Sequence, residues 1–429
     1  MWHFETDAEF QTQLDWIDEF VKQKVEPLDH LLGSQWNIHD PRFEKLARPL
    51  QAEVQERGLW ACHLGPELGG KGYGQVKLAL MNELFGRSRF GPIIFGSQAP
   101  DTGNAEILAH YGTEEQKEQF LKPLLANEIV SCFSMTEPQG GADPLVFTTS
   151  ATSDGDEWVI SGEKWFSSNA RYAAFLIVMA VTDPDAPPYK RMSMFIVPSD
   201  TPGVEIIRNA SFYGEPEATH AYMRYDNVRV PKENMLGGRG DAFVVAQVRL
   251  GGGRLHHAMR TVAQSRRALE MMCERALSRT TKGELLGNKQ MVQEKIADSW
   301  VQLRQFRLLV LETAWLIDQG HDYKSIRKHI AAVKSAMPGV LHDIAARALQ
   351  IHGSIGLSNE MPFSDWVMNS YHIALADGPT EVHKVTVARE VLKEFEPTSD
   401  LFPDYHLLNE HQRALDLYGD LLDELAASG

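Results

Sequence analysis

The sequence predicts an α+β protein in which a sheet-forming middle segment lies between two helical segments. Apolar residues recur at three- and four-residue spacing in the first 130 residues and again from about residue 241. Residues 130 to 240 instead hold short apolar runs that end at glycine, proline or aspartate, which is typical of a small antiparallel barrel or sandwich. Because strands and helices do not alternate, the pattern argues against a doubly wound nucleotide-binding fold.

The N-terminal helices are predicted from amphipathic repeats. Phe10, Leu14, Ile17 and Val21 lie on one face of a first helix, with acids and amides between them. Three further helices are expected at 43–57, 76–86 and 113–125, the last beginning with the N-cap signal Thr113 followed by two glutamates.

Strands are expected at 157–161, 175–181, 193–197 and 219–228, and long helices at 255–276, 291–320 and 326–351. At 429 residues the chain is long enough for about three domains. We expect an N-terminal helical domain at 1–130, a middle β-domain at 131–240 and a C-terminal helical bundle at 241–394. A C-terminal extension at 395–429 ends in an amphipathic helix around Leu415 to Leu425.

Composition excludes several classes of protein. The formal net charge of −16 disfavours binding to nucleic acid phosphates. The longest apolar run, Ala173 to Val181, is far shorter than the roughly 20 residues of a membrane span. Cys62, Cys132 and Cys273 are widely spaced, so we expect neither a disulfide framework nor a cysteine-held metal. The acidic N-terminus has no targeting pattern, and we expect a cytoplasmic protein.

Three short motifs are weak matches to other enzyme classes. The stretch Gly65 to Gly72 nearly matches a P-loop, but position 72 is glycine where the magnesium-binding hydroxyl is needed. His256 and His257 are adjacent, so on a helix they point about 100° apart and cannot grip one metal together. Gly237 to Gly240 lacks the spacing of a dinucleotide-binding loop. No metal site and no nicotinamide site are therefore expected.

Several other stretches fit one proposal together. They are Met135–Pro138, Lys164–Asn169, Arg254–His257, Arg279–Gln290 and His352–Gly356 followed by Ala376–Glu381. In these stretches, and in their order from about residue 5 to 393, the sequence resembles the acyl-CoA dehydrogenase family, closest to the branch of family members 10 and 11. The resemblance implies a C-terminal four-helix bundle, FAD as cofactor and a homodimer or homotetramer, because a neighbouring subunit completes the flavin site.

The resemblance assigns one group of residues to the flavin ring. An isoalloxazine is a flat, electron-poor plate, which needs an aromatic wall and hydrogen-bond donors. The family motif implies that Met135, Thr136 and Ser168 contact the flavin and that Phe166 stands where many members carry tryptophan. Taken alone, Lys164 to Asn169 is also compatible with an ordinary core strand, and Met135 to Pro138 with an ordinary strand end.

A second group is assigned to the rest of FAD. Arg279 and Gln290 match the two ends of the family's arginine-to-glutamine pattern, which supplies fixed charge near the pyrophosphate, although Lys282 and Leu285 depart from its interior. The remaining members, some reached from a second subunit, are Gln350, Gly353, Gly356, Thr380 and Glu381. Gly353 and Gly356 are equally compatible with a simple helix C-cap.

The resemblance implies a reaction in which a carboxylate removes the α-proton of an acyl thioester while the β-hydride goes to flavin N5. Of the two base positions in the family, one is Gly253 here and the other is Asp377, which leaves Asp377 as the candidate base. Arg254 and Gly378 are assigned to the acyl-CoA. Taken alone, Arg254 could instead form a salt bridge, and Asp377 could be a turn residue. Position 142, where some members carry a serine that contacts CoA, is alanine here.

The expected partners are the acyl-CoA substrate and an electron-transfer flavoprotein, with neither nucleic acid nor membrane. The alternative is a nitroalkane oxidase-like or acyl-CoA oxidase-like flavoenzyme that passes electrons to oxygen. A DNA-associated branch of the same family relies on a basic C-terminal face, but the only Lys or Arg of residues 395–429 is Arg413.

Overall fold

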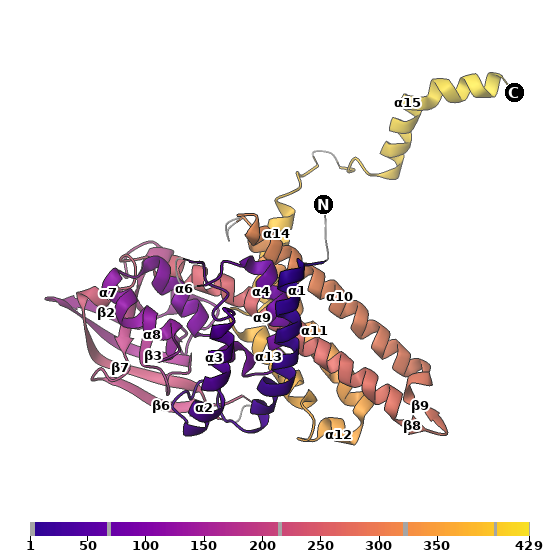
Figure 1. Ribbon diagram of the computed structural model, residues 1–429. Coiled ribbons are helices and arrows are strands. Elements are labelled where there is room, and N and C mark those ends of the chain that lie inside the picture. The colour runs from indigo at the N-terminus through magenta and orange to yellow at the C-terminus, as the bar shows by residue number, and fades with distance from the viewer. Residues whose placement is uncertain (1–4, 67–69, 213–216, 321–324, 399–400, 429) are drawn as a thin grey trace.

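The structure is a computed structural model that describes residues 5–66, 70–212, 217–320, 325–398 and 401–428. Its elements follow the predicted helix, sheet, helix order (Figure 1). The N-terminal helices are α1 (Ala8–Phe20), α2 (Pro41–Leu46), α3 (Arg48–Glu56), α4 (Gly74–Phe85), α5 (Gly91–Ile94), α6 (Asp101–Tyr111), α7 (Glu114–Gln116) and α8 (Lys122–Leu125). No helix among the described residues has the length and apolar character that crossing a bilayer requires.

The middle segment forms one seven-stranded sheet. Its strands are β1 (Ser131–Ser134), β2 (Ser150–Asp154), β3 (Glu157–Ser168), β4 (Phe175–Val181), β5 (Met192–Pro198), β6 (Val204–Ala210) and β7 (His220–Pro231). The sheet corrects the expectation of a purely antiparallel domain, because β1 and the start of β2 both pair in parallel with β4. All seven residues of β4 are buried, as expected for a strand that is covered on both faces.

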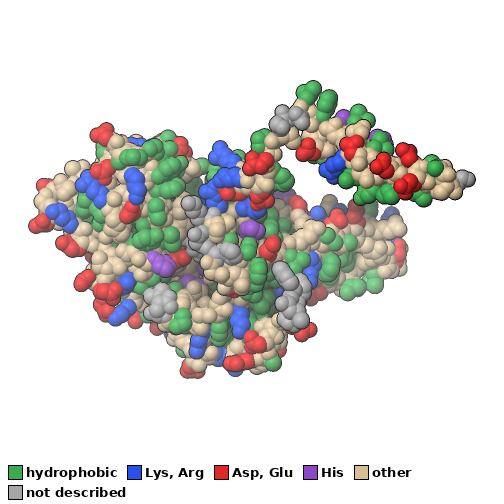
Figure 2. Space-filling model, turned by 90° about the horizontal axis from the view of Figure 1, so that it is seen from above, with side chains coloured by type: hydrophobic (Ala, Val, Ile, Leu, Met, Phe, Trp, Pro, Cys, Tyr) green, Lys and Arg blue, Asp and Glu red, His purple; other side chains and the backbone are tan. Residues whose placement is uncertain are grey.

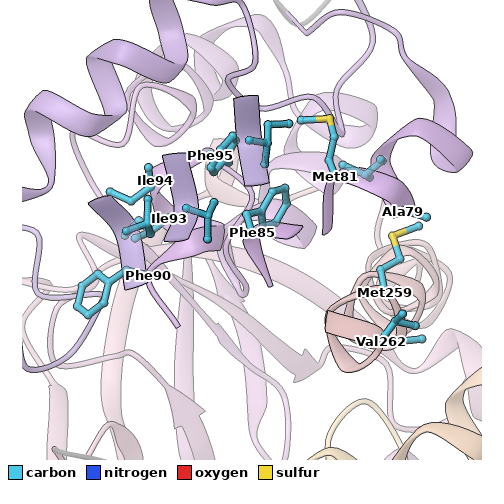
Figure 3. Close-up of a cluster of buried hydrophobic side chains, with 14 of the residues drawn as sticks. Ala79, Met81, Phe85, Phe90, Ile93, Ile94, Phe95, Met259 and Val262 are labelled. Carbon is cyan, nitrogen blue, oxygen red and sulfur yellow. The ribbon is translucent and has the colours of Figure 1, made fainter. Parts of the chain in front are cut away.

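The C-terminal segment is built on the 37-residue helix α9 (Ala242–Ser278). After the β8–β9 hairpin (Thr280–Thr281 and Glu284–Leu285), α10 (Gln290–Asp318), α11 (Arg327–His352) and α13 (Phe363–Leu375) run alongside it (Figure 1). Short α12 (Ser354–Leu357) and then α14 (Thr380–Leu392) complete this part. One apolar core joins α4 and α5 to α9, and it includes Met81, Phe85, Phe95, Met259 and Val262 (Figure 3).

The last helix, α15 (Leu407–Ala427), extends away from the bundle (Figure 1). It has no buried residue, and apolar and acidic side chains share its surface (Figure 2). The predicted amphipathic helix therefore exists and is longer than the expected 415–425 segment. Within this chain, its apolar side chains add nothing to the core that holds the other helices.

Candidate active site

A cavity of about 1340 Å³ lies between the β-domain and the C-terminal helices. Its wall takes residues from the end of β1, from the end of β3, from the first turns of α9 and from the α13–α14 turn. Seven of the predicted site residues lie on this wall: Met135, Thr136, Phe166, Ser168, Arg254, Asp377 and Gly378. The fold therefore brings together residues that are up to 243 positions apart in the sequence (378 − 135).

A buried ion pair fixes two parts of the wall to each other. The Lys164 ammonium lies 2.8 Å from Glu137 Oε1, and the two side chains are 0% and 1% exposed. Lys164 Nζ also donates to the Met135 carbonyl at 2.8 Å, and the Trp165 N–H donates to the Thr136 carbonyl at the same distance. Both residues lie in stretches that the sequence analysis singled out, but no local pattern predicts their pairing, because they are 27 positions apart.

The electrostatics keep this pair charged at neutral pH. Burial lowers the pKa of Lys164 to about 8, with Glu137 opposing that shift. Burial works to raise the pKa of Glu137, but Lys164 and the hydrogen bonds from Thr148 and Thr149 bring it below its usual value. Because both groups are ionised and bonded to each other, the loop after β1 and strand β3 hold a fixed relative position.

Phe166 has an unusual backbone conformation. Its φ is +51°, and the β3–β7 register shifts between Lys164 and Ser167, so Phe166 sits in a bulge. The side chain is 40% exposed and stacks on Phe212 at 5.8 Å and 14°, with Trp165 edge-on at 4.7 Å. A left-handed φ in an aromatic residue costs about 1–3 kcal/mol, and such strain clusters at functional sites. The bulge presents a flat aromatic surface to the cavity.

Ser168 ends the same strand and has a partner that the sequence did not reveal. Its hydroxyl lies 2.7 Å from His220 Nδ1, at the start of β7. His220 also lines the cavity, and its ring lies 4.2 Å from that of Phe212. The two residues are 52 positions apart and no short motif contains both, so only the strand pairing could have found this contact.

Asp377 occupies the turn between α13 and α14. Its φ is +55° and that of Gly378 is +100°, which makes a turn that points the Asp377 side chain inward, 17% exposed. Arg254 Nε donates to the Asp377 carbonyl at 3.0 Å, and His383 Nε2 lies 3.3 Å from the same oxygen. A Cβ at position 253 would lie 3.2 Å from Asp377 Oδ2. Gly253 therefore leaves the space that the Asp377 carboxylate uses.

The carboxylate of Asp377 is surrounded by basic groups. It lies 3.9 Å from Arg249 and 3.7 Å from His257 Nε2. Burial works to raise the pKa of Asp377, but His257, Arg249, Arg254 and Lys334 more than offset it, so the pKa lies below its usual value. Burial lowers the pKa of His257 to about 3, so its ring is neutral at pH 7. Asp377 is thus an ionised carboxylate that can accept a proton inside a sheltered cavity.

The second group of predicted residues lies elsewhere. Arg279, Gln290, Gln350 and Gly353 are exposed at the end of the bundle where α9 ends, α10 begins and α11 meets α12 (Figure 1). Gly353, with φ +69°, is the C-cap of α11, which agrees with the helix C-cap interpretation of this glycine. A Cβ at Gly356 would lie 2.3 Å from the Leu349 carbonyl, so close packing requires glycine there.

Thr380 and Glu381 begin α14 and do not line the cavity. The Thr380 hydroxyl donates to the Ala374 carbonyl at 3.3 Å, which closes the turn around Asp377, and Glu381 is exposed. The chain therefore does not bring the two predicted groups into one site. The arrangement fits a flat aromatic cofactor at the cavity wall, because a strained aromatic residue and two hydroxyl groups face the same space.

Comparison with known proteins identifies relatives over most of the chain. Sequence models of the acyl-CoA dehydrogenase N-terminal, middle and C-terminal domains match residues 7–128, 132–228 and 240–392. Acyl-CoA dehydrogenase family member 10 of Mus musculus is 40% identical over 87% of this chain and 36% of its own length. FadE2 of Mycobacterium tuberculosis, named as an acyl-CoA dehydrogenase, is 38% identical over 91% of this chain and 93% of its own length.

The chain spans only 49% of the length of family member 11 of Gallus gallus, to which it is 39% identical. Among solved structures, one from Mycobacterium abscessus assigned as an acyl-CoA dehydrogenase has a TM-score of 0.85 at 38% identity, over 92% of this chain and 100% of that one. Butyryl-CoA dehydrogenase of Megasphaera elsdenii has a TM-score of 0.78 at 25% identity, over 91% and 100%. These structures confirm the predicted fold class.

Proposed function

Because the chain belongs to the acyl-CoA dehydrogenase family of oxidoreductases, we propose that it converts an acyl-CoA thioester to the 2-enoyl-CoA with FAD as cofactor. The observation that carries the proposal is Asp377, an ionised carboxylate sheltered in the cavity that Phe166 also lines. Removing an α-proton from a thioester needs such a base close to the acyl chain. The family match supplies the substrate class, and the cavity supplies a site for the reaction.

Asp377 takes the α-proton in this proposal. Its pKa is low before substrate binds, and exclusion of water by the acyl chain would raise it toward a value that suits a base. Arg254 holds the backbone of the same turn through its bond to the Asp377 carbonyl, and Gly378 lets the chain pass close to the substrate. As the thioester oxygen gains negative charge, backbone N–H groups of this turn are suitable donors for it.

The residues on the wall fit a bound flavin. Phe166 offers the flat surface, Thr136 and Ser168 offer hydroxyl groups, and Met135 lies on the same wall. When bound, FAD supplies the acceptance of the two electrons that leave the substrate. We assign Arg279, Gln290, Gln350, Gly353, Gly356, Thr380 and Glu381 to the rest of FAD, in part across a subunit boundary of a homodimer or homotetramer. An electron-transfer flavoprotein is the proposed acceptor.

The test is anaerobic titration of the purified, FAD-loaded protein with a panel of acyl-CoAs, following the loss of the flavin absorbance. The wild-type flavin should bleach with at least one acyl-CoA. Asp377→Asn should keep FAD but bleach roughly 100- to 10,000-fold more slowly, because that is the usual contribution of general-base catalysis. Asp156→Asn, an exposed carboxylate on the β-domain, is the matched control and should bleach normally.

Two outcomes would contradict the proposal. If Asp377→Asn bleaches at the wild-type rate, Asp377 is not the base. If acyl-CoAs fail to bleach the flavin while nitroalkanes drive oxygen consumption, the chain is a nitroalkane oxidase-like enzyme. Peroxide formation during acyl-CoA turnover in air would instead identify an acyl-CoA oxidase.

A further inference from the structure

Arg249, in the second turn of α9, has no role in the proposed function so far. Its side chain is 11% exposed, it lines the cavity, and its Nη1 lies 3.9 Å from Asp377 Oδ1. A buried guanidinium is costly unless the protein compensates its charge. Other contacts must therefore hold the Arg249 guanidinium next to Asp377.

A chain of hydrogen bonds anchors Arg249 to helix α6 and strand β1. Arg249 Nε donates to Asn104 Oδ1 at 2.9 Å, and the Asn104 amide nitrogen donates to Ser131 Oγ at 2.9 Å. The Ser131 hydroxyl in turn donates to Asp101 Oδ1 at 2.6 Å. These three partners are all buried, so the anchor is part of the interior of the protein.

Packing also shapes the space around the guanidinium. A Cβ at Gly103 would lie 2.9 Å from Arg249 Cγ, so glycine leaves room for the side chain to pass. The centre of the guanidinium lies 4.0 Å from the ring centroid of Phe133, a favourable cation–π distance. Hydrogen bonds and packing thus hold the Arg249 side chain against α6, and its Nη1 lies on the side of Asp377.

Other charged and titratable groups also face Asp377. They come from α9, α11 and α14 and are Arg254, His257, Arg260, Lys334 and His383. Two of them are imidazoles whose pKa burial lowers, to about 3 for His257 and about 4 for His383, so both are neutral at pH 7.

The cations among these groups have other partners. Arg254 Nε bonds to the backbone carbonyl of Asp377, and Lys334 Nζ donates to the Ile373 carbonyl at 2.6 Å. Among the described residues, Arg249 is the permanent cation that comes within 4 Å of the carboxylate itself.

We propose that Arg249 is a positioning residue for Asp377, held by Asn104 so that the carboxylate stays ionised and fixed in direction when a bound acyl chain excludes water. The inference rests on the proposed function, in which Asp377 is the base. It adds that the reactivity of the base depends on an anchor in the N-terminal helices. Without Arg249, less positive charge would oppose the effect of burial on the carboxylate. The pKa of Asp377 would therefore rise, and the base would be protonated at higher pH.

The experiment compares Arg249→Gln and Arg249→Lys in the FAD-loaded protein. The rate of flavin bleaching by acyl-CoA is measured against pH, and the protonation of Asp377 is followed by infrared difference spectra against Asp377→Asn. We expect Arg249→Gln to move the acid limb of the rate profile and the infrared midpoint upward together by about one pH unit. Arg249→Lys should restore part of the shift because it keeps the charge.

The controls separate positioning from stability. Asn104→Ala keeps the guanidinium but removes its anchor, so it should give a smaller upward shift, and it carries the test if Arg249→Gln does not fold. Arg239→Gln, which removes an exposed arginine that pairs with Asp183, should leave both readouts unchanged.

The proposal is overturned if the infrared midpoint and the acid limb stay at their wild-type values in Arg249→Gln, or in Asn104→Ala where only that variant folds. If the infrared midpoint of Asp377 moves upward but no acyl-CoA bleaches the flavin, the proposed function is refuted. The coupling between Arg249 and Asp377 would still hold in that case. The two failures are therefore distinguishable.

Discussion

The two ends of the C-terminal bundle differ in how far a single chain fixes the residues assigned to the cofactor. At the cavity, buried contacts hold the wall: Lys164 bonds to Glu137, and Arg254 bonds to the turn of Asp377. At the other end, Arg279 and Gln290 are exposed and lie outside the cavity. The comparison teaches that contacts within one chain fix the residues of the cavity wall, whereas the residues at the far end stay exposed within that chain.

The largest effect should come from breaking the buried ion pair behind the cavity wall. Lys164→Met leaves the Glu137 carboxylate buried without its cation, so we expect a loss of about 3–5 kcal/mol in the free energy of unfolding. Urea denaturation followed by circular dichroism measures it. The double variant Glu137→Gln with Lys164→Met should lose less, because no buried charge remains unpaired.

Arg229→Gln, which breaks exposed pairs with Asp154 and Glu157, is the matched control and should leave the urea midpoint nearly unchanged. If Lys164→Met and Arg229→Gln have equal effects, the cavity wall is not held by the buried pair. The contrast between a fixed wall and an exposed far end would then lose its basis.

A smaller effect is expected at the far end of the bundle. Arg279→Gln removes a charge that we assign to the FAD pyrophosphate, so FAD affinity should fall by roughly 10- to 100-fold, since a charge-assisted hydrogen bond contributes about 1.5–3 kcal/mol. Fluorescence of released FAD on dilution measures this loss. At saturating FAD, the rate of bleaching by acyl-CoA should stay at the wild-type value, because the cavity is untouched. If the affinity for FAD is unchanged, Arg279 does not contact the cofactor.

The smallest effect is expected from deleting residues 396–429. Helix α15 contributes no buried residue, so the free energy of unfolding should change by no more than about 0.5 kcal/mol. Thermal unfolding of the truncated chain measures this, and sedimentation gives its subunit number. A lower melting temperature together with a smaller assembly would mean that α15 covers the surface of another subunit.

The sequence predicted those parts of the fold that depend on local patterns. The helices expected at 291–320 and 326–351 appear as α10 and α11, and the buried run at 175–181 is β4. The parallel pairing of β1 with β4 could not be predicted, because alternation of apolar residues within a strand does not specify the direction of its neighbour. The resemblance to family members 10 and 11 is confirmed by identities of 40% and 39%.

The candidate site was predictable where a motif carried it and not where contacts are distant. Asp377 and Phe166 came from the resemblance, and both prove to have left-handed φ values. Arg249 and His220 were missed because their partners Asn104 and Ser168 are 145 and 52 positions away. Such pairs arise only when helices and strands pack, so no local pattern records them.

The left-handed backbone at position 377 also bears on why an aspartate stands there. Aspartate and asparagine adopt this conformation several-fold more readily than longer side chains. A glutamate would bring a longer reach but would make the turn before Gly378 harder to form. The geometry of the main chain thus favours a short side chain at the position of the proposed base, and exchanging Asp377 for asparagine removes the carboxylate while preserving the turn.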